Sequence, residues 1–274
     1  VLVLLAAGVP AVRLPSPRET QHNEALIVVA VTFLLSAALL SFSLAEPGVP
    51  YADALFEAVS GVTSTGLTTL PTLNGRSHTF IFLRAWLQWF GGLGIAVMSV
   101  ALLASHRVAD RQLTEGPGVE DFTTTARAYA RRLLAVYAVI TLAGLVLLRV
   151  FVPDTLTAAA YILSSVSTGG FAPRDGSLAA LNGWEARYSV MFFSFLGAVP
   201  LILYFHAYRG EWRKVWGDLE LRGLLAATAG TILLLSLIMP RQAGLTSAQT
   251  LEQTVVPAVS ALTPTGFAPF DVDA

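Results

Sequence analysis

The stretch FEAVSGVTSTGLTTL, residues 56–70, decides the fold of this chain. Its first half is mostly apolar, and its second half is the run Thr63-Ser64-Thr65-Gly66-Leu67-Thr68-Thr69. Such a run does not continue a helix, because Ser and Thr side chains bond to nearby backbone and Gly adopts positive φ without a Cβ clash. The stretch therefore predicts a short helix that leads into a non-helical loop.

The same pattern recurs twice further along the chain. Residues 163–173 read LSSVSTGGFAP and residues 259–269 read VSALTPTGFAP. The Thr-Gly pair recurs after 103 and then 97 residues, at Thr65-Gly66, Thr168-Gly169 and Thr265-Gly266. The second copy is ambiguous by one residue, because two glycines precede its Phe and only one precedes the Phe of the third. This repetition predicts that one unit of about a hundred residues is used repeatedly.

The composition predicts that most of the chain lies in lipid. Of the 274 residues, 54% are hydrophobic and only 13% are charged, whereas soluble domains carry about 25% charged residues. The absence of cysteine excludes disulfides, thiolate metal sites and a cysteine nucleophile. The net charge of -1 gives no basic excess that would point to nucleic acid. Because the sequence begins at Val1 rather than Met, we interpret it as a fragment at both ends.

The first unit is predicted to contain a long helix, a half-helix, a loop and a second long helix. Residues 25–45 carry no charge and suffice to span a bilayer, which requires roughly 20 apolar residues. Residues 51–62 are too few to span it and fit a re-entrant half-helix. Residues 79–104 form the return helix. The predicted fold class is an all-α integral membrane protein, built from such units around a pseudo-symmetric pore axis.

The rest of the chain divides in the same way. The second unit has a long helix at 133–152, a half-helix at 154–166 and a return helix at 188–208, with a bend at Gly197 and Pro200. The predicted divisions are residues 1–24 (end of a preceding helix and cytoplasmic linker), 25–104 (repeat 1), 105–126 (cytoplasmic loop), 127–208 (repeat 2), 209–222 (cytoplasmic loop) and 223–274 (first half of repeat 3). In the third unit we expect a helix at 223–240 and a half-helix at 250–262.

The distribution of Lys and Arg predicts the orientation. Residues 10–24, 105–132 and 209–222 hold 11 of the 17 basic residues, and such an excess marks the cytoplasmic side. The loops that follow the half-helices are then entered from outside. On that side nine acidic residues against four basic ones give a charge of -5.

Non-helical loops at membrane depth are tolerated only where protein or a water-filled path surrounds them. A ring of backbone carbonyls there can replace the water shell of a monovalent cation, and the C-terminal end of each half-helix adds partial negative charge. We therefore expect a cation filter made mainly of backbone carbonyls. Its candidate residues are Ser64, Thr65, Gly66, Leu67, Ser167, Thr168, Gly169, Gly170, Pro264, Thr265, Gly266 and Phe267.

These features resemble the Trk/Ktr/HKT superfamily of potassium transporters, and most closely its bacterial TrkH family. The resemblance rests on FEAVSG at residues 56–61 with the run that follows, on WLQWFGGLGI at residues 86–95, and on the loops at 167–171 and 265–267. It extends from about Pro15 onward. One Thr-Gly pair is a weak signal, but three at a near-constant interval, together with the 86–95 segment, are specific.

The resemblance implies potassium uptake, with K+ as the transported ion, by a multi-pass protein of the bacterial inner membrane. It also implies four repeats per subunit, a homodimer in contact with membrane lipid, and a cytosolic nucleotide-binding regulatory subunit of the TrkA/KtrA type. No organic cofactor, nucleic-acid partner or enzymatic activity is implied. The chain departs from the family in lacking the third return helix and the fourth repeat, and in having Pro264 where the family often has Thr or Ser.

Several single side chains also carry expectations. Arg84 and Arg149 lie near helix ends and are expected to reach toward the membrane surface. Gln88, among apolar residues, is expected to form hydrogen bonds across helices. Asp53 and Asp154 stand where half-helices begin, which favours capping. The glycines of the 86–95 segment are expected to pack helices closely: Gly91, Gly92 and Gly94.

Two other classes of function remain open from the sequence, a membrane-embedded enzyme and a packing scaffold without transport. An enzyme would need an acid–base or metal constellation at membrane depth, and none is seen in the apolar segments. A scaffold would not need half-helices that end in glycine loops. The discriminating observation is whether Gly66, Gly169 and Gly266 converge on one axis.

Overall fold

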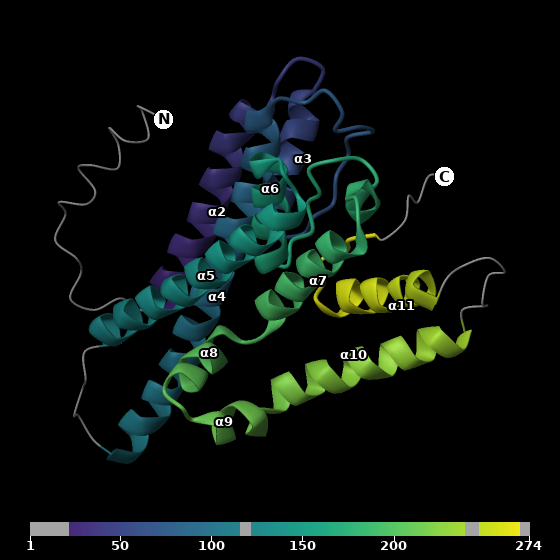
Figure 1. Ribbon diagram of the computed structural model, residues 1–274. Helices are drawn as coiled ribbons and strands as arrows, with labels where there is room; N and C mark the ends of the chain where they lie inside the picture. Colours follow the sequence, from purple (N-terminus) through teal and green to yellow (C-terminus); the bar gives the residue numbers. More distant parts are fainter. Residues whose placement is uncertain (1–21, 116–121, 239–246, 269–274) are drawn as a thin grey trace.

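The computed structural model describes residues 22–115, 122–238 and 247–268, without the side chains of 22–26, 99–115, 122–129, 247–250 and 252. All regular elements in these ranges are helices (Figure 1). They are α2 (His22–Leu44), α3 (Tyr51–Val62), α4 (His78–Glu115), α5 (Phe122–Phe151), α6 (Thr155–Val166), the 3-10 helix η1 (Ser177–Ala180), α7 (Trp184–Ala198), α8 (Leu201–Tyr208), α9 (Trp212–Gly217), α10 (Leu219–Ile238) and α11 (Ser247–Leu262).

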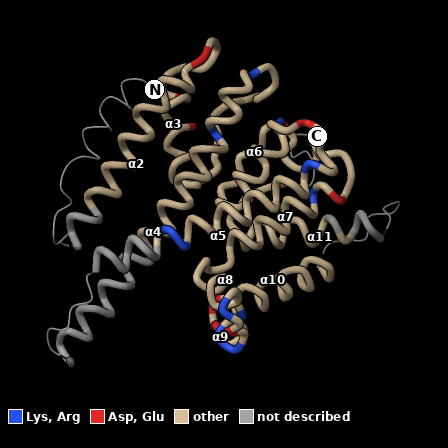
Figure 2. The backbone as a smooth tube through the Cα atoms, turned by 60° about the vertical axis from the view of Figure 1, so that its left-hand side comes forward, with Lys and Arg blue, Asp and Glu red and all other residues tan. Residues whose placement is uncertain are grey.

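Four of the described helices are long and apolar enough to cross a membrane, within α2, α4, α5 and α10. The pair α7 and α8 passes the same test together, although its axis bends by 88°. Figure 2 shows charged residues around α9 and in the loops at the opposite end of the molecule, while the helices between them are mostly uncharged. The predicted class, an all-α membrane protein with several spans, is confirmed.

Repeat 1 is built from α2, α3 and α4, with the half-helix α3 packed between the two long helices. Its buried cluster joins Leu44 of α2, Ala54 and Ala58 of α3, and Phe80 and Leu87 of α4. The helix α3 ends at Val62, as predicted, because the small polar run that follows leaves the helical conformation. Asp53 does not cap α3, since the residue before the helix is Pro50.

Repeat 2 is built from α5, α6, α7 and α8, and the half-helix α6 is its most buried element. It packs against α4 of repeat 1 as well as α5 and α7. Asp154 caps α6, as predicted, by accepting from the N–H groups of Leu156 (3.4 Å) and Thr157 (3.0 Å). Hydrogen bonds from Thr157, the largest influence, hold the pKa of the Asp154 carboxyl below its usual range.

The return helix of repeat 2 bends where the sequence predicted it. Helix α7 ends at Ala198, Val199 is extended, and Pro200 is the N-cap residue of α8. Proline favours this break because its ring removes an N–H from the helical ladder and disfavours α-helical backbone in the residue before it.

The structure differs from two of the predicted loops. Helix α4 runs to Glu115 rather than ending at residue 104, because Ala, Leu, Arg, Gln and Glu in this segment all favour a helix. Residues 209–222 contain the short helix α9 and the start of α10. In the third unit α10 lies beside α11, and α11 packs against α7 (Figure 1).

Candidate functional site

The three loops that follow α3, α6 and α11 share one backbone path. Each has a non-glycine residue with positive φ: Ser64 at 55°, Thr168 at 53°, and Pro264, whose ring resists this conformation, at 25°. Two residues later each has a glycine with positive φ: Gly66 at 78°, Gly170 at 78° and Gly266 at 65°. Non-glycine residues in this region cost about 1–3 kcal/mol each and cluster at functional sites.

The backbone hydrogen bonds of the loops also repeat. The Ser60 carbonyl accepts from Thr65 N (2.9 Å) and Gly66 N (3.5 Å). The Ser164 carbonyl accepts from Gly169 N (2.9 Å) and Gly170 N (3.4 Å), and the Ser260 carbonyl accepts from Thr265 N (3.0 Å) and Gly266 N (3.5 Å). The N–H groups of each loop are therefore turned back onto the end of its own half-helix.

These repeats fix the register that the sequence left ambiguous. Gly170, not Gly169, is the equivalent of Gly66 and Gly266, and Gly169 is the equivalent of Thr65 and Thr265. Of the two registers that the sequence left open, the one that pairs Thr168-Gly169 with the other two Thr-Gly pairs is therefore excluded. The extra glycine replaces the threonine of the other loops.

The loops meet at these glycines. A Cβ built on Gly66 would lie 1.9 Å from the carbonyl oxygen of Gly169, and one built on Gly170 would lie 1.5 Å from that of Thr265. Loop 1, which follows α3, therefore contacts loop 2, which follows α6, and loop 2 contacts loop 3, which follows α11. Each contact is a backbone approach that only glycine permits. A Cβ on Gly266 would meet nothing within 4 Å among the described residues.

Glycines on the return helices hold the half-helices at a similarly close distance. A Cβ on Gly91 of α4 would lie 1.9 Å from the carbonyl oxygen of Val62, the last residue of α3. A Cβ on Gly197 of α7 would lie 2.4 Å from that of Val166, the last residue of α6. Gly92 and Gly94 face Ser167 and Phe33, so the predicted packing role of all three glycines of α4 is confirmed.

A buried ion pair supports the outer arms of loops 1 and 2. Arg84 Nε of α4 donates to Glu57 Oε2 of α3 at 2.6 Å, and the side chains are 2% and 0% exposed. The other oxygen of Glu57 accepts from the Thr68 hydroxyl and the Thr69 N–H of loop 1. The Arg84 guanidinium donates to the Ala172 carbonyl at 3.3 Å and lies 3.9 Å from the ring centre of Phe171 in loop 2.

This pair corrects the prediction for Arg84. Arg84 does not reach the membrane surface but is buried beside Glu57, one of the nine acidic residues counted on the outer side, because each supplies the charge that the other needs when buried. Arg149, in contrast, is exposed and donates to the Val152 and Pro153 carbonyls just after its own helix, as expected of a residue near a helix end.

Gln88 forms the cross-repeat hydrogen bonds that its position suggested, but to a loop rather than to a helix. Its Nε2 donates to the Gly169 carbonyl at 2.7 Å, and its Oε1 accepts from Phe171 N at 2.9 Å. Sequence reasoning missed its place at the site, although a buried amide in an apolar span was the available signal.

The contact between repeats 2 and 3 uses different side chains. Tyr161 of α6 lies 6.0 Å from Phe267 of loop 3, ring centre to ring centre, and its hydroxyl donates to the Ser177 carbonyl at 2.6 Å. Beyond the loop, Ala268 N donates to the Ser177 hydroxyl and Leu178 N donates to the Ala268 carbonyl, both at 3.1 Å.

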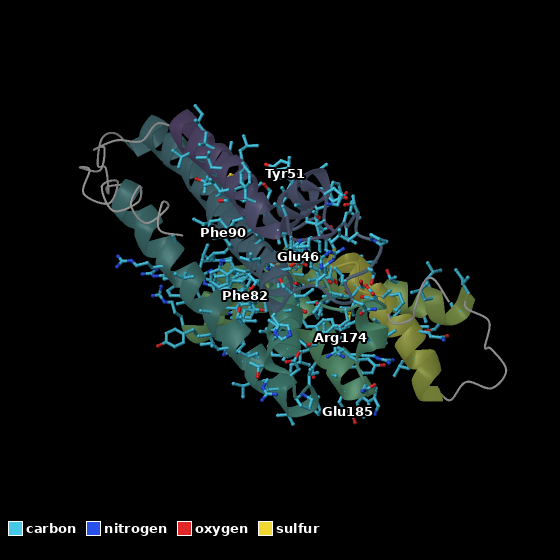
Figure 3. All side chains as sticks on the ribbon, turned by 90° about the horizontal axis from the view of Figure 1, so that it is seen from above. Glu46, Tyr51, Phe82, Phe90, Arg174 and Glu185 are labelled. Carbon is cyan, nitrogen blue, oxygen red and sulfur yellow. The ribbon has the colours of Figure 1, made fainter. Side chains whose placement is uncertain are left out.

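Asp175 ties the outer segments of repeats 1 and 2 together. Its carboxylate accepts from the Thr72 hydroxyl (2.5 Å) and from Leu73 N (2.7 Å). Burial alone would raise the pKa of the Asp175 carboxyl, but these hydrogen bonds together hold it below the usual value. In the view from above, the neighbouring Arg174 lies between Tyr51 at the start of α3 and Glu185 at the start of α7 (Figure 3).

Two of the candidate carbonyls are already hydrogen-bonded within the protein: that of Gly169 by Gln88, and that of Leu67 by the Ser60 hydroxyl at 2.6 Å. Within the described residues no donor binds the other ten candidate carbonyls, those of Ser64, Thr65, Gly66, Ser167, Thr168, Gly170, Pro264, Thr265, Gly266 and Phe267. Thr168 and Pro264 also line a cavity of about 340 Å³, with Gly197, Pro200 and Glu220 among its other residues.

The family model described as "TrkH: Cation transport protein" matches residues 5–240. The chain belongs to this family. It is 30% identical over 259 residues to the TrkH potassium uptake protein of Escherichia coli K12, covering 91% of this chain and 54% of that protein. It is 29% identical over 266 residues to TrkI of Halomonas elongata, covering 96% of this chain and 54% of that protein.

The fold agrees with a solved member of the TrkH family. The crystal structure of the potassium transporter TrkH from Vibrio parahaemolyticus superposes with a TM-score of 0.80 at 26% identity. The match covers 98% of this chain and 57% of that one. The chain thus spans about half the length of the relatives it matches.

Proposed function

We propose that this chain forms part of a potassium-uptake pathway, in which backbone carbonyls of the three loops take over from water around K+. Its TrkH and TrkI relatives are named as potassium uptake proteins, which supports the choice of ion. The observation that carries the proposal is the direct backbone approach of loop 1 to loop 2 and of loop 2 to loop 3.

The chemistry of the loops suits a desolvated cation. The half-helices α3, α6 and α11 all end at the loops, so their C-terminal partial charges of roughly half an electron lie close by. The loops present carbonyl oxygens, because their N–H groups are used by the half-helices. A hard monovalent cation prefers such oxygen ligands, and carbonyl rings are known to replace its hydration shell.

The proposed filter is narrower than the residues 64–67, 167–170 and 264–267 expected from the sequence. The candidate carbonyl oxygens without an internal donor are the best candidates for ion ligands: Ser64, Thr65, Gly66, Ser167, Thr168, Gly170, Pro264, Thr265, Gly266 and Phe267. Gly169 and Leu67 contribute by shaping the loops, since their carbonyls already accept side-chain hydrogen bonds. The Ser64 and Ser164 hydroxyls are buried without a hydrogen-bond partner among the described residues.

The remaining assignments extend this proposal to the whole protein. We place it in the bacterial inner membrane with the half-helices entering from outside, as the basic residues of the other side suggest. We also propose a homodimer and a cytosolic nucleotide-binding regulatory subunit. The packing of the loops and the family membership do not favour a membrane enzyme or a scaffold without transport.

Gly66→Ala in the full-length protein that carries this sequence tests the proposal. The substitution places a Cβ against the Gly169 carbonyl. When the variant is expressed in a bacterial strain that lacks its own K+ uptake systems, we expect K+ uptake to fall at least about tenfold. Gly75→Ala is the matched control, because Gly75 has φ of 81° but open space around it, and uptake should persist. Failure of the unmodified protein to transport K+, or normal uptake by Gly66→Ala at equal abundance, would overturn the proposal.

A further inference from the structure

Loop 2 departs from the other two loops at one position. Residue 169 is glycine, whereas its equivalents are Thr65 and Thr265. A Cβ on Gly169 would lie 2.5 Å from Cδ of Gln88 and 2.7 and 2.8 Å from the two polar atoms of that amide. A side chain at residue 169 and the amide of Gln88 therefore compete for the same space.

Gln88 uses this space to hold the backbone of loop 2 on both sides of Gly170. The amide is fully buried, donates to the carbonyl before that glycine and accepts from the N–H after it. Its Nε2 also lies 3.5 Å from where a Cβ of Gly66 would be. The side chain thus sits at the junction of loops 1 and 2, and its two hydrogen bonds fix the rotation of loop 2.

At the equivalent position of repeat 2 the helix residue is small and the loop residue that accompanies it is large, which is the reverse of Gln88 and Gly169. Gln88 lies three residues before Gly91, and the residue three before Gly197 is Ser194. Ser194 is also fully buried, but its hydroxyl donates to the Val190 carbonyl of its own helix at 3.0 Å. A large polar residue on the helix accompanies a glycine in loop 2, while a small one accompanies the threonine of loop 3.

We propose that Gln88 is the positioning residue of the second filter loop and that it sets the preference for K+ over Na+. The inference rests on the proposed function. By binding the Gly169 carbonyl, Gln88 keeps this oxygen out of the ion path and fixes the spacing between loops 1 and 2. Selectivity depends on the number and arrangement of the carbonyls around the ion, so release of one carbonyl alters it.

The test compares Gln88→Met with Ser194→Ala in the full-length protein. Met keeps the length and apolar volume of Gln but neither donates to Gly169 nor accepts from Phe171. We expect the ratio of K+ to Na+ flux into proteoliposomes to fall about tenfold, which lies within the range expected for two lost hydrogen bonds. Ser194→Ala removes only a bond within its helix and should leave the ratio unchanged.

A second arm tests the competition for space. Gly169→Thr alone should abolish uptake. Gly169→Thr combined with Gln88→Ser recreates the combination of Ser194 in repeat 2 with Thr265 in loop 3 and should restore part of the uptake. Residues that share one space are expected to show such non-additivity. The partial recovery distinguishes a positioning role from general loss of folding.

The outcomes separate the two proposals. If the unmodified protein conducts no K+, the function itself is wrong. If it conducts K+ selectively and Gln88→Met keeps the same ratio, Gln88 does not position the filter. If the double variant transports no better than Gly169→Thr, the two residues do not compete and the inference is also wrong.

Discussion

The interface between repeats 1 and 2 and the interface between repeats 2 and 3 share a backbone but not its supporting side chains. In the first, Glu57, Arg84 and Gln88 hold loops 1 and 2 with a buried charge pair and an amide. In the second, the position of Glu57 is taken by Tyr161, which packs against Phe267. The difference teaches that half-helix carbonyls and glycines set the backbone path that the loops share, while different side chains hold each loop in place at the two interfaces.

The largest effect is expected from breaking the charge pair. Glu57→Leu leaves Arg84 buried without its partner, which typically costs about 3–5 kcal/mol. We expect a large fall in the thermal unfolding temperature of the purified full-length protein in detergent. The double variant Glu57→Tyr with Arg84→Val gives this interface the residues found at the equivalent positions of repeat 2 and should recover most of the loss. Equal stability of the single and double variants would show that the two interfaces are not interchangeable.

An intermediate effect is expected at the glycines that the two repeats share. Gly91→Ala and Gly197→Ala each force a methyl group against a half-helix carbonyl, and overpacking costs about 1–3 kcal/mol. Because the approach is 1.9 Å at Gly91 and 2.4 Å at Gly197, the first variant should unfold at the lower temperature. Gly230→Ala in α10 has open space and should not destabilise, since Ala favours a helix over Gly. A reversed order would contradict the geometry.

The smallest effect is expected from the hydrogen bonds that join the outer segments at the two interfaces, those of Asp175 at the first and of Ser177 at the second. The Asp175 carboxyl has a lowered pKa in the folded state, so its contribution is present above the ordinary aspartate value of about 4. It is lost as the pH falls through the lower folded-state pKa. The tie through Ser177 and Ala268 contains no titratable group. Asp175→Asn should therefore flatten the acid limb of the stability profile, while Ser177→Ala should lower stability equally at every pH.

The sequence predicted the elements of this fold well, for identifiable reasons. Apolar length marked the spanning helices, and the change from apolar to small polar residues marked the end of each half-helix at Val62, Val166 and Leu262. These are local properties of the chain. The end of α4 was misplaced because charged residues that favour a helix look the same in a loop or in a helix that extends past the membrane.

The support of the loops was not predictable from local pattern. Glu57 and Arg84 lie 27 residues apart on different helices, so only the packing of α3 against α4 reveals that they neutralise each other. Gln88 and Gly169 are 81 residues apart and belong to different repeats. The register of Gly169 and Gly170 likewise depends on φ and on hydrogen bonds to Ser164, which two adjacent glycines in a sequence do not specify.

The carbonyls of Ser60, Ser164 and Ser260, each of which accepts two hydrogen bonds, also affect which sign of charge the loops can bind. Each binds two successive amides of its loop. At these positions the loops therefore present carbonyl acceptors to the proposed ion path, while their amide donors are already hydrogen-bonded. Chloride or phosphate would find no comparable cradle of N–H groups, of the kind that anion sites at other backbone turns provide. The loops would therefore distinguish cations from anions independently of ion size. A single hydrogen-bond-donating side chain introduced there should weaken this distinction.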